Sequence, residues 1–354
     1  MGEEVGDGGG SSSSSAVDFD DLGFGCEHVG RTRMFVAKHN PLGWSGDLRP
    51  YGPLEFDPAA QVLNYGQSIF EGMKAQRTPT GDIVLFRPDQ NALRMMDGAL
   101  RMAMPQVPEN FFVKAVVETV QANAHLVPPH GKGSLYVRPL LLGSGAILGL
   151  GPAPEYTFLV YVAPVGAYFK GGQLDPIDLV VEQTFHRAAP GGTGGTKAAG
   201  NYSPVLPAQL RAKAEGFADV IYLDAVSNLY LEEVSSCNIF VVKGNRISTP
   251  PLTGTILPGI TRKSVIELAR SRGYEVHEEP VSIDAAMDAD EMFTCGTAVV
   301  LCPVGSITYG GAKKQYGAPG EPTPVALELY QALTDLQLQK SADPFGWVYP
   351  VEGV

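Results

Sequence analysis

Residues 189–202, APGGTGGTKAAGNY, contain one lysine, Lys197, among small and uncharged residues. A phosphate-binding Walker loop has its lysine directly after the last glycine and a serine or threonine after the lysine. Here Thr196 precedes Lys197 and Ala198 follows it, so the stretch departs from that motif at two positions. A solvated lysine in a surface loop is one remaining interpretation. The other is a lysine that forms a Schiff base, which requires an unprotonated amine, and burial among small residues favours that state.

Seven segments of the chain, this one included, together resemble the branched-chain amino acid aminotransferases, and the plant members above all. These are class IV (fold type IV) enzymes that use pyridoxal 5'-phosphate (PLP). One such motif would be weak, but seven in the family's order over roughly residues 20–350 are specific. The segments are LNYGQSIFEGMKAQR (63–77), LFRPDQNALRM (85–95), LYVRPLLLGSG (135–145), HRAAPGGTGGTKAAGNYSP (186–204), LEEVSSCNIFVVKGN (231–245), GTILPGITRKS (254–264) and GTAVVLCPVG (296–305).

The resemblance implies PLP as the cofactor and a role for each residue that touches its ring. Lys197 would hold PLP as a Schiff base and, once freed by the incoming amino acid, would move a proton between substrate and cofactor. Tyr202 would hydrogen-bond the phenolic oxygen. Glu233 would pair with the pyridine nitrogen, because a protonated nitrogen makes the ring an electron sink. Glu232 points to the opposite face if this segment is a strand, and Ser236 stands where many members have threonine.

The cofactor's phosphate site is implied in three separate pieces. Arg94 matches the family's phosphate-binding arginine. The backbone N–H groups of Thr255 and Ile256 precede the expected helix GITRKSVIELARS, where the helix dipole and free N–H groups favour an anion. Thr297 would add a hydroxyl group. Without the resemblance, Arg94 would be interpreted as a helix-surface residue and the two threonines as turn residues.

Four residues match the part of the family's site that binds substrate carboxylates. Tyr136 and the backbone of Thr297 and Ala298 would bind the α-carboxylate. Arg138 follows Tyr136 by two residues, so both side chains lie on one face of a strand. Arg138 would then bind the distal carboxylate of glutamate.

Three aromatic residues match the family's wall around a branched side chain: Phe70, Tyr65 and Tyr168. Taken singly, each would be interpreted as an ordinary core residue. The tyrosine that matches Tyr65 reaches in from the neighbouring subunit in this family. The resemblance therefore implies an obligate homodimer.

The implied reaction is a ping-pong transamination. A branched-chain L-amino acid (Leu, Ile or Val) gives its amino group to PLP and leaves as a 2-oxo acid, and 2-oxoglutarate then takes the group and leaves as L-glutamate. Other class IV chemistry, as in D-amino acid aminotransferases or aminodeoxychorismate lyases, is one alternative. A non-catalytic protein that acts through its dimer surface is another, although it would not need Lys197, Glu233 and Arg94.

The chain departs from the family pattern in two places. Animal members carry a redox-active C-x-x-C after the GTA motif, whereas here VVLC leaves only Cys302, so no thiol switch of that kind is expected. The segment FGCEHVGRTRMF (24–35) lacks the pattern common in plant relatives. Because that segment helps to wall the substrate pocket, a methionine-related substrate is a further alternative.

The elements that must position these residues predict an α+β fold of type IV. Strands are expected in 33–40, 81–88, 133–145 and 155–166 and helices in 89–104 and 109–127, forming a small N-terminal domain over 21–165. A turn-rich linker, 166–176, precedes a larger domain over 177–354. Its many short strands and Gly/Pro turns indicate a barrel-like unit.

Composition leaves small molecules and other proteins as the expected partners. The 354 residues carry a formal charge of -12, which argues against nucleic acid, and no apolar run is long enough for a membrane span. The four cysteines and six histidines show no metal-ligand spacing, so no metal is expected. The acidic Gly/Ser-rich residues 1–20 suggest a disordered leader. They favour a cytoplasmic location, with a plastid or mitochondrion as the alternative if a transit peptide has been removed.

Overall fold

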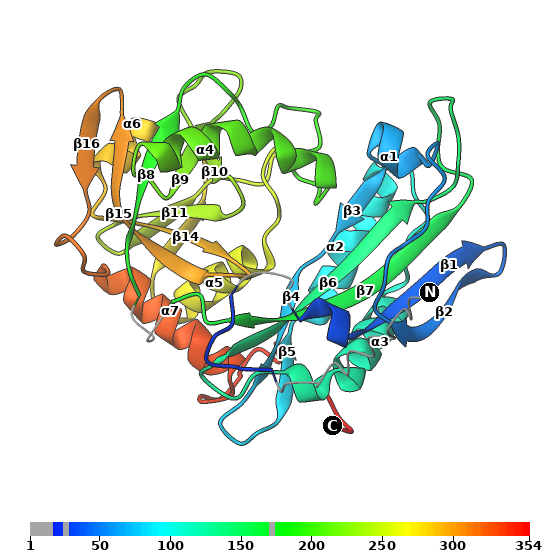
Figure 1. The fold of residues 1–354 in the computed structure, drawn as a ribbon. Coiled ribbons are helices and arrows are strands. Elements are labelled where there is room, and N and C mark those ends of the chain that lie inside the picture. Colours follow the sequence, from blue (N-terminus) through cyan, green and yellow to red (C-terminus); the bar gives the residue numbers. More distant parts are fainter. Residues whose placement is uncertain (1–16, 24–27, 170–173) are drawn as a thin grey trace, which may run out of the picture.

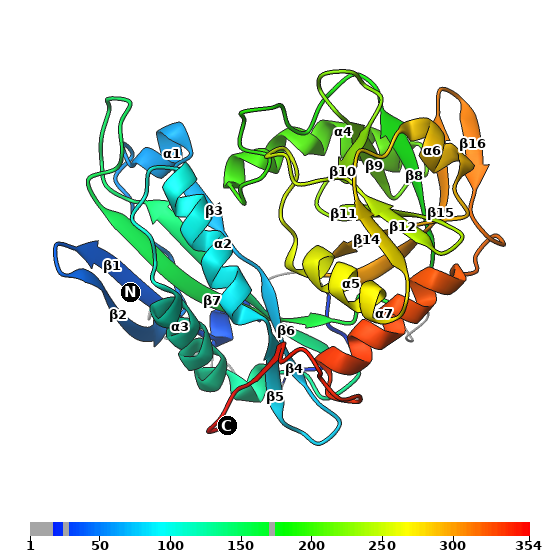
Figure 2. The ribbon, with the colours of Figure 1, turned by 180° about the vertical axis from the view of Figure 1, so that it is seen from behind.

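Two β-sheets organise the chain, each with its own helices (Figures 1 and 2). The computed structural model describes residues 17–23, 28–169 and 174–354. We call the first sheet with helices α1 to α3 the first lobe, and the second sheet with helices α4 to α7 the second lobe. In both views the two lobes stand side by side and meet at one end of the first sheet.

The first sheet has the order β17-β5-β4-β6-β7-β1-β2, with β3 beside β6, and all its pairs are antiparallel. β6 and β7 are its longest strands and pair along their full lengths. The strands are β1 (Arg33–Asn40), β2 (Gly43–Pro50), β3 (Ser68–Phe70), β4 (Met73–Arg77), β5 (Ile83–Phe86), β6 (Gly133–Gly143), β7 (Tyr156–Gly166) and β17 (Val348–Pro350).

Helices α2 (Pro88–Arg101) and α3 (Glu109–Ala122) cover one face of this sheet, while α1 (Gln61–Tyr65) is a short turn before β3 (Figure 2). The buried residues of α3 fall at intervals of three and four, as an amphipathic helix requires. Phe112 of this face packs against Phe158 of β7, with ring centroids 5.8 Å apart. Short 3-10 turns at Val29–Arg31 and Ala124–Leu126 complete the lobe.

The second sheet closes on itself. Its order is β10-β9-β8-β15-β14-β11-β12-β13, and an additional pairing between β10 and β11 joins the path into a ring. The ring contains β10, β9, β8, β15, β14 and β11, while β12 and β13 extend it beyond β11 and β16 pairs with β15. The strands are β8 (Ile177–Glu182), β9 (Asp219–Leu223), β10 (Leu231–Val234), β11 (Asn238–Lys243), β12 (Arg246–Thr249), β13 (Glu275–Glu278), β14 (Glu291–Gly296), β15 (Val300–Tyr309) and β16 (Ala312–Gln315).

Helices α5 and α7 pack together against one side of this ring, near the first lobe, and the residues between them and the strands form one apolar core. Val265, Leu268, Leu329 and Leu333 are among its fully enclosed members. The helices are α4 (Leu206–Ala214), α5 (Ile260–Ser271), α6 (Ile283–Asp288) and α7 (Pro324–Gln337), with 3-10 turns at Ala199–Asn201 and Ser203–Val205.

The predicted α+β class with a barrel-like second sheet is confirmed. The first sheet takes its strands from 33–166 and the second from 177–315, except that β17 returns from the end of the chain to pair with β5. The domains predicted over 21–165 and 177–354 stay a prediction. β17 falls within the second of these ranges but belongs to the first sheet. Part of the predicted linker, 170–173, and residues 1–16 of the predicted leader lie outside the described residues.

Neither a membrane-spanning helix nor a metal-binding cluster is found among the described residues. Along the described part of the chain, no helix combines the length and the apolar character that crossing a membrane demands. Over the same ranges, no group of three or more His, Cys, Asp or Glu side chains is arranged to hold a metal ion.

Candidate active site

Lys197 lies where the two lobes meet. Its loop runs from β8 to α4 and touches the first sheet, because Ala198 forms an antiparallel bridge with Ile69 of β3. The backbone N–H of Phe70 donates to the carbonyl of Lys197 at 3.1 Å. The predicted base and the predicted aromatic wall residue are therefore fixed to each other through the backbone.

The Lys197 amine is surrounded by aromatic rings and cations. Nζ lies 3.2 Å from the Tyr202 hydroxyl and 4.7 Å from the centre of the Phe70 ring. Burial, reinforced by the charge of Arg94, lowers the pKa of Lys197 to about 8. Burial also raises the pKa of Tyr202 to about 12, so its hydroxyl is a hydrogen-bond donor at neutral pH. A larger neutral fraction of the amine suits it to Schiff-base chemistry.

Glu233 is a buried carboxylate at the end of β10. Arg187 Nη1 lies 2.7 Å from one of its oxygens, and the side chains of both residues are almost fully excluded from solvent. The Asn238 side chain and the Leu257 N–H also donate to it, at 2.7 and 3.1 Å. Burial nevertheless raises the pKa of Glu233 to about 7, although Arg187 and the Leu257 N–H favour the ionised form.

Glu232, the next residue, is also buried. Its Oε2 has no hydrogen-bond partner within the described residues, and burial raises its pKa. A hydrogen bond with the Thr255 side chain opposes this shift. The neighbour of Glu233 therefore does not share its contacts with Arg187 and Asn238.

Arg94 projects from α2 and meets a residue to which the sequence assigned no role. Its Nε and Nη2 donate to the two carboxylate oxygens of Glu71, at 2.8 and 2.7 Å, and its Nη1 donates to the Pro258 carbonyl at 3.1 Å. Asn91 donates to the same carboxylate at 2.7 Å. Burial disfavours the charge of Arg94, but the Glu71 carboxylate outweighs it, and the pKa of Arg94 is raised.

Thr255 and Ile256 are buried in the loop before α5. The helix begins at Ile260, so both residues precede its first turn, and the helix dipole acts on them less than the sequence suggested. The glycines of the Lys197 loop press directly against this segment: a side chain at Gly194 would place its Cβ 2.2 Å from the Thr255 carbonyl oxygen. Only glycine allows the two backbones to approach so closely.

Thr297 and Ala298 form the turn between β14 and β15. The Thr297 hydroxyl donates to the Gly72 carbonyl at 3.3 Å, which brings the turn against the first lobe. A Cβ at Gly72 would lie 2.2 Å from the Tyr136 hydroxyl, so this glycine leaves room for the tyrosine. Three candidate pieces of the site therefore meet at one point.

Tyr136 and Arg138 share one face of β6. Arg138 Nη2 donates to the Tyr136 hydroxyl at 3.2 Å, and its guanidinium carbon lies 4.8 Å from the centre of the Phe70 ring. Arg138 Nε is buried and has no hydrogen-bond partner within the described residues. A buried donor without a partner is costly, and a substrate carboxylate would satisfy it.

The remaining three predicted residues lie at the edges of this arrangement. Tyr65 is exposed at the end of α1, and its hydroxyl donates to the Leu148 carbonyl at 2.7 Å. Tyr168 is half-exposed, packs edge-on against Phe169 and lies close enough to Cys302 for charge coupling. Ser236 is exposed in the turn between β10 and β11, beside Cys237.

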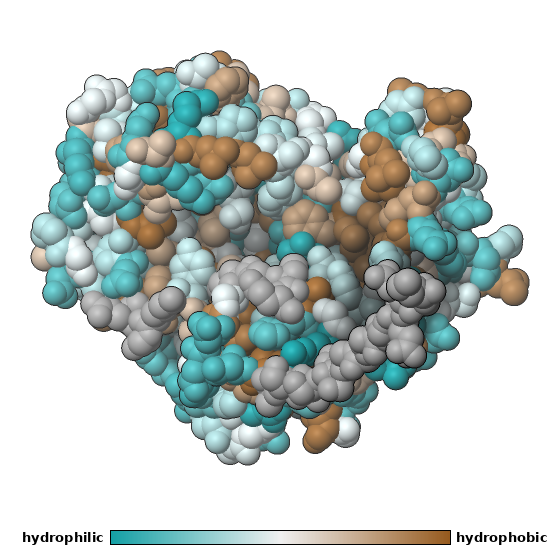
Figure 3. Space-filling model, viewed as in Figure 1, coloured by the Kyte–Doolittle hydropathy of each residue, from teal (hydrophilic) through white to brown (hydrophobic). Residues whose placement is uncertain are grey.

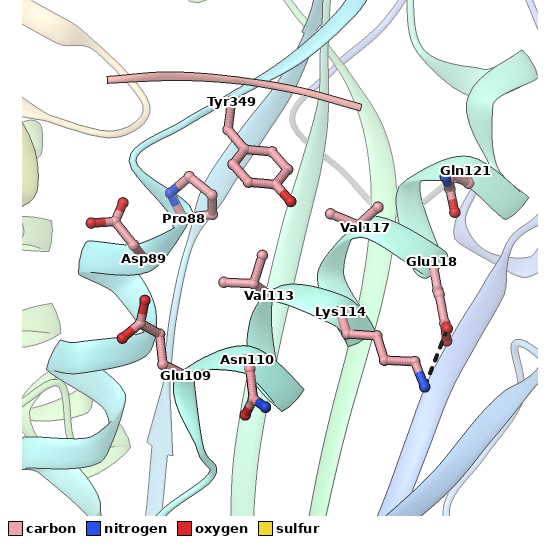
Figure 4. Close-up of a pocket in the computed structure, with 10 residues that line it drawn as sticks. All are labelled: Pro88, Asp89, Glu109, Asn110, Val113, Lys114, Val117, Glu118, Gln121 and Tyr349. Atoms are coloured by element: carbon pink, nitrogen blue, oxygen red, sulfur yellow. Dashed lines mark ion pairs between the residues drawn. The ribbon is translucent and has the colours of Figure 1, made fainter. Parts of the chain in front are cut away.

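The surface of the molecule is hollowed between the two lobes, and hydrophobic residues line the wall on the side of the first lobe (Figure 3). A separate groove lies elsewhere. It has a volume of about 840 Å³ and lies between the start of α2, helix α3 and β17, where Tyr349 faces Val113 and Val117 (Figure 4). None of the predicted site residues lines this groove.

Sequence reasoning missed the charged partners of two predicted residues, Glu71 for Arg94 and Arg187 for Glu233. Both lie inside quoted motifs, in IFEGMK and HRAAPGG. A buried charge is rarely left unpaired, so each expected buried charge calls for an opposite one nearby. This rule predicts that Arg94 and Glu233 each have a partner of opposite charge. The sequence does not indicate which carboxylate and which arginine those partners are.

Comparison with known proteins agrees with this geometry. Residues 68–307 match the family described as amino-transferase class IV. A chloroplastic branched-chain-amino-acid aminotransferase 5 of Arabidopsis thaliana is 55% identical over 94% of this chain and 79% of its own length. A methionine aminotransferase of the same plant is 43% identical over 95% of this chain and 94% of its own. The crystal structure of an Escherichia coli branched-chain amino acid aminotransferase superposes with a TM-score of 0.77 at 29% identity, covering 90% of this chain and 99% of that one.

The match covers the Lys197 loop, the Glu233 strand and most of both lobes, and it agrees in sequence and in fold. The chain therefore belongs to the class IV aminotransferases and, within them, to the branched-chain aminotransferases.

Proposed function

We propose that the protein transfers the amino group of branched-chain L-amino acids to 2-oxoglutarate, with PLP as its cofactor. The observation that carries this proposal is the meeting of Lys197, Glu233 and Arg138 around one site at the junction of the lobes. A base, a buried carboxylate and a cation beside an aromatic ring are what the two half-reactions require.

The residues present fit PLP. Bound PLP supplies an aldehyde and a pyridinium ring that withdraws electrons from the reacting carbon. Lys197 would hold it covalently, Tyr202 would donate to its phenolic oxygen, and Glu233 would face its ring nitrogen. The phosphate would be held by Arg94, the backbone of Thr255 and Ile256, and the Thr297 hydroxyl. In support, the Ile256 N–H forms no hydrogen bond within the described residues, so it is free to bind an anion.

Lys197 moves the proton. As a free amine with a lowered pKa, Lys197 would be the base that takes the proton from the substrate α-carbon and carries it to the carbon that was the cofactor's aldehyde. Tyr202, 3.2 Å from Nζ, keeps the amine oriented. Arg187 and Asn238 hold the Glu233 carboxylate in place, so it is already oriented before the reaction begins.

One pocket accepts two different side chains in turn. Phe70 and Tyr202 pack edge to face with ring centres 4.9 Å apart and offer an apolar wall to a branched side chain. Arg138 stacks over Phe70, and its free Nε can bind the second carboxylate of 2-oxoglutarate or glutamate. Tyr136 and the Thr297–Ala298 turn bind the α-carboxylate common to all four substrates.

The proposal includes a homodimer. Leu63 and Tyr65 at α1 and Leu148 and Leu150 in the loop between β6 and β7 are exposed, from 45% for Tyr65 to 85% for Leu150. The Tyr65–Leu148 hydrogen bond joins the two segments into one apolar surface. Such a surface is costly in water and typical of a subunit interface. Seated against a second copy, it would bring Tyr65 to the partner's site.

The location of the protein also belongs to the proposal. The Arabidopsis thaliana relative is named as chloroplastic. This favours the plastid or mitochondrion alternative over the cytoplasmic location that the acidic leader suggested. A fluorescent fusion of the full-length gene product tests it directly.

A substrate panel tests the activity. The purified protein with PLP and 2-oxoglutarate should consume L-Leu, L-Ile and L-Val, and the Lys197→Ala variant should lose at least about 10²- to 10⁴-fold in rate. Activity on D-Ala alone would refute the branched-chain assignment. A strong preference for L-Met would instead place the protein with its methionine-specific relative.

A further inference from the structure

Lys74 is a half-buried lysine of β4 whose amine points at the second lobe. Its Nζ donates to the Ala298 carbonyl at 2.5 Å. Burial lowers the pKa of Lys74 to about 8, and no neighbouring carboxylate contributes to that shift. An amine enclosed without a carboxylate is destabilising. An uncharged side chain of nearly the same length, such as methionine, would fill this place between the lobes with a smaller desolvation cost.

The register of the first sheet places this lysine beside the carboxylate-binding residues. Lys74 of β4 pairs directly with Tyr136 of β6. Directly paired residues of antiparallel strands have their side chains on the same face, so Lys74, Tyr136 and Arg138 project from that face together. The positive groups of Lys74 and Arg138 therefore stand on the two sides of Tyr136.

Two bonds hold the Thr297–Ala298 turn to one short segment of the first lobe. The Thr297 hydroxyl donates to the Gly72 carbonyl at 3.3 Å, and Lys74 donates to the Ala298 carbonyl two residues further along β4. The bond from Lys74 fixes the orientation of the peptide between Ala298 and the next residue. The N–H of that peptide belongs to Val299 and points away from the carbonyl. The Thr297 and Ala298 N–H groups lie just before it in the same turn, so anchoring this peptide limits how far the turn can move.

The turn also ends in a strained residue. Val300 has a φ of 60°, in the left-handed region that a β-branched residue rarely adopts. Such a conformation persists only where neighbouring contacts enforce it, and it is common at functional sites. Lys74 and Gly72 hold the two residues at the start of the same turn, Ala298 and Thr297.

A small cavity lies beside Lys74. It has a volume of about 30 Å³ and is lined in part by Lys74, Asn91, Thr297 and Gln337. This volume holds about one water molecule and no substrate. The Lys74 amine is engaged with the Ala298 carbonyl, so its contact in this structure is with the turn.

We propose that Lys74 is a positioning residue of the α-carboxylate site: by binding the Ala298 carbonyl, it holds the Thr297–Ala298 turn with its N–H groups toward the substrate carboxylate. The inference rests on the proposed function, since it concerns the same amino-acid site. The amino acid and the 2-oxo acid both carry an α-carboxylate. Loss of Lys74 should therefore weaken the binding of both substrates to a similar extent.

The test compares Lys74→Met and Lys74→Arg with the wild-type holoenzyme. The Met variant keeps the length of the chain without a donor, and the Arg variant restores a donor and a charge. Lys114→Met is the matched surface control, because Lys114 is exposed on α3 and forms an ion pair with Glu118. The KM values for L-Leu and for 2-oxoglutarate are measured separately from kcat.

A binding measurement distinguishes this inference from the proposed function. The holoenzyme is titrated with 4-methylvalerate, which has the carboxylate and the branched chain but no amino group, and with 4-methylpentan-1-ol, which lacks the carboxylate. We expect Lys74→Met to lower the affinity for 4-methylvalerate and to raise both KM values by about 10- to 100-fold. This is the effect expected when a hydrogen bond from a charged donor is lost. Affinity for the alcohol, PLP content and kcat should change less than about threefold, within 0.7 kcal/mol.

Two results would overturn the inference. One is a Lys74→Met enzyme whose affinity for 4-methylvalerate stays within twofold of wild type. The other is an equal loss for the acid and the alcohol, which would mean that Lys74 only supports the fold. Recovery in Lys74→Arg supports the inference. Because the titration needs no turnover, it remains decisive if the wild-type enzyme prefers a different amino acid.

Discussion

Arg94 and Glu71 form a bidentate ion pair at the site, with Nε and Nη2 of the arginine 2.8 and 2.7 Å from the two carboxylate oxygens. Glu71 is fully buried, and Asn91 donates to it as well. The third nitrogen of Arg94 reaches the Pro258 carbonyl in the loop before α5. Glu71 therefore fixes the plane of a guanidinium whose remaining N–H groups are available to a phosphate.

Replacement of Glu71 by Gln should weaken the binding of PLP, because the phosphate of PLP is then held less well. Gln keeps the size of the side chain but can accept only one of the two bonds, so Arg94 loses its orientation. We expect the Kd for PLP to rise by about 10- to 100-fold, as when a residue that orients a ligand-binding group is lost. Equilibrium titration of the apoenzyme measures it.

Pyridoxal, which lacks the phosphate, is the control ligand for this variant. Its affinity should change much less than that of PLP, since pyridoxal has no phosphate for Arg94 to hold. An equal loss of pyridoxal and PLP would show that Glu71 supports the fold and not the phosphate site. The thermal unfolding of both apoproteins separates these outcomes.

The strands and helices that carry the site were largely predictable from the sequence, because their apolar spacing is regular. The expected strand at 33–40 is β1, and the expected helix at 89–104 overlaps α2 (Pro88–Arg101) except for its first residue. Partners across the lobes were not predictable. Lys74 and Ala298 are far apart in sequence, and their contact depends on how two independently formed sheets dock.

The position of β17 illustrates the same limit. Its three residues, Val348–Pro350, pair with β5, although more than 260 residues separate them in the chain. No local pattern indicates such a pairing. The adjacent Trp347 makes long-range contacts as well: its ring is stacked on Phe345 and lies under the Arg87 guanidinium. Local propensity determines an element, whereas packing determines its neighbour.

Arg138 should discriminate between the two half-reactions. In Arg138→Leu, we expect the KM for 2-oxoglutarate to rise by about 10- to 100-fold, because the second carboxylate loses its cation. The half-reaction with L-Leu should change less, since both substrates lose the hydrogen bond to Tyr136 equally. Single-turnover kinetics of each half-reaction give the ratio. Arg138→Lys keeps the charge without the planar fork and should recover only part of it. An unchanged ratio in Arg138→Leu would remove Arg138 from the substrate site.

The capture of PLP by the apoenzyme should depend on pH through Lys197. Only the neutral amine attacks the aldehyde, and its pKa is lowered to about 8, so the rate should rise through pH 8 and then level off. Arg138 is one of the cations that disfavour protonated Lys197. Removing it raises the pKa, so Arg138→Leu should shift the midpoint to higher pH. Rapid-mixing absorbance measures both profiles, and a midpoint that moves down would contradict this electrostatic account.

Tyr65 should act in the site of the partner subunit. The Tyr65→Ala and Lys197→Ala enzymes should each be weak or inactive alone. If Tyr65 serves the other protomer, a mixed dimer contains one site with both mutations and one site with neither, because Lys197 of one chain meets Tyr65 of the other. Unfolding and refolding the two variants together should then restore transamination above that of either alone. Mixing without refolding is the control. If Tyr65 served its own chain, every site would keep one mutation and no activity would return.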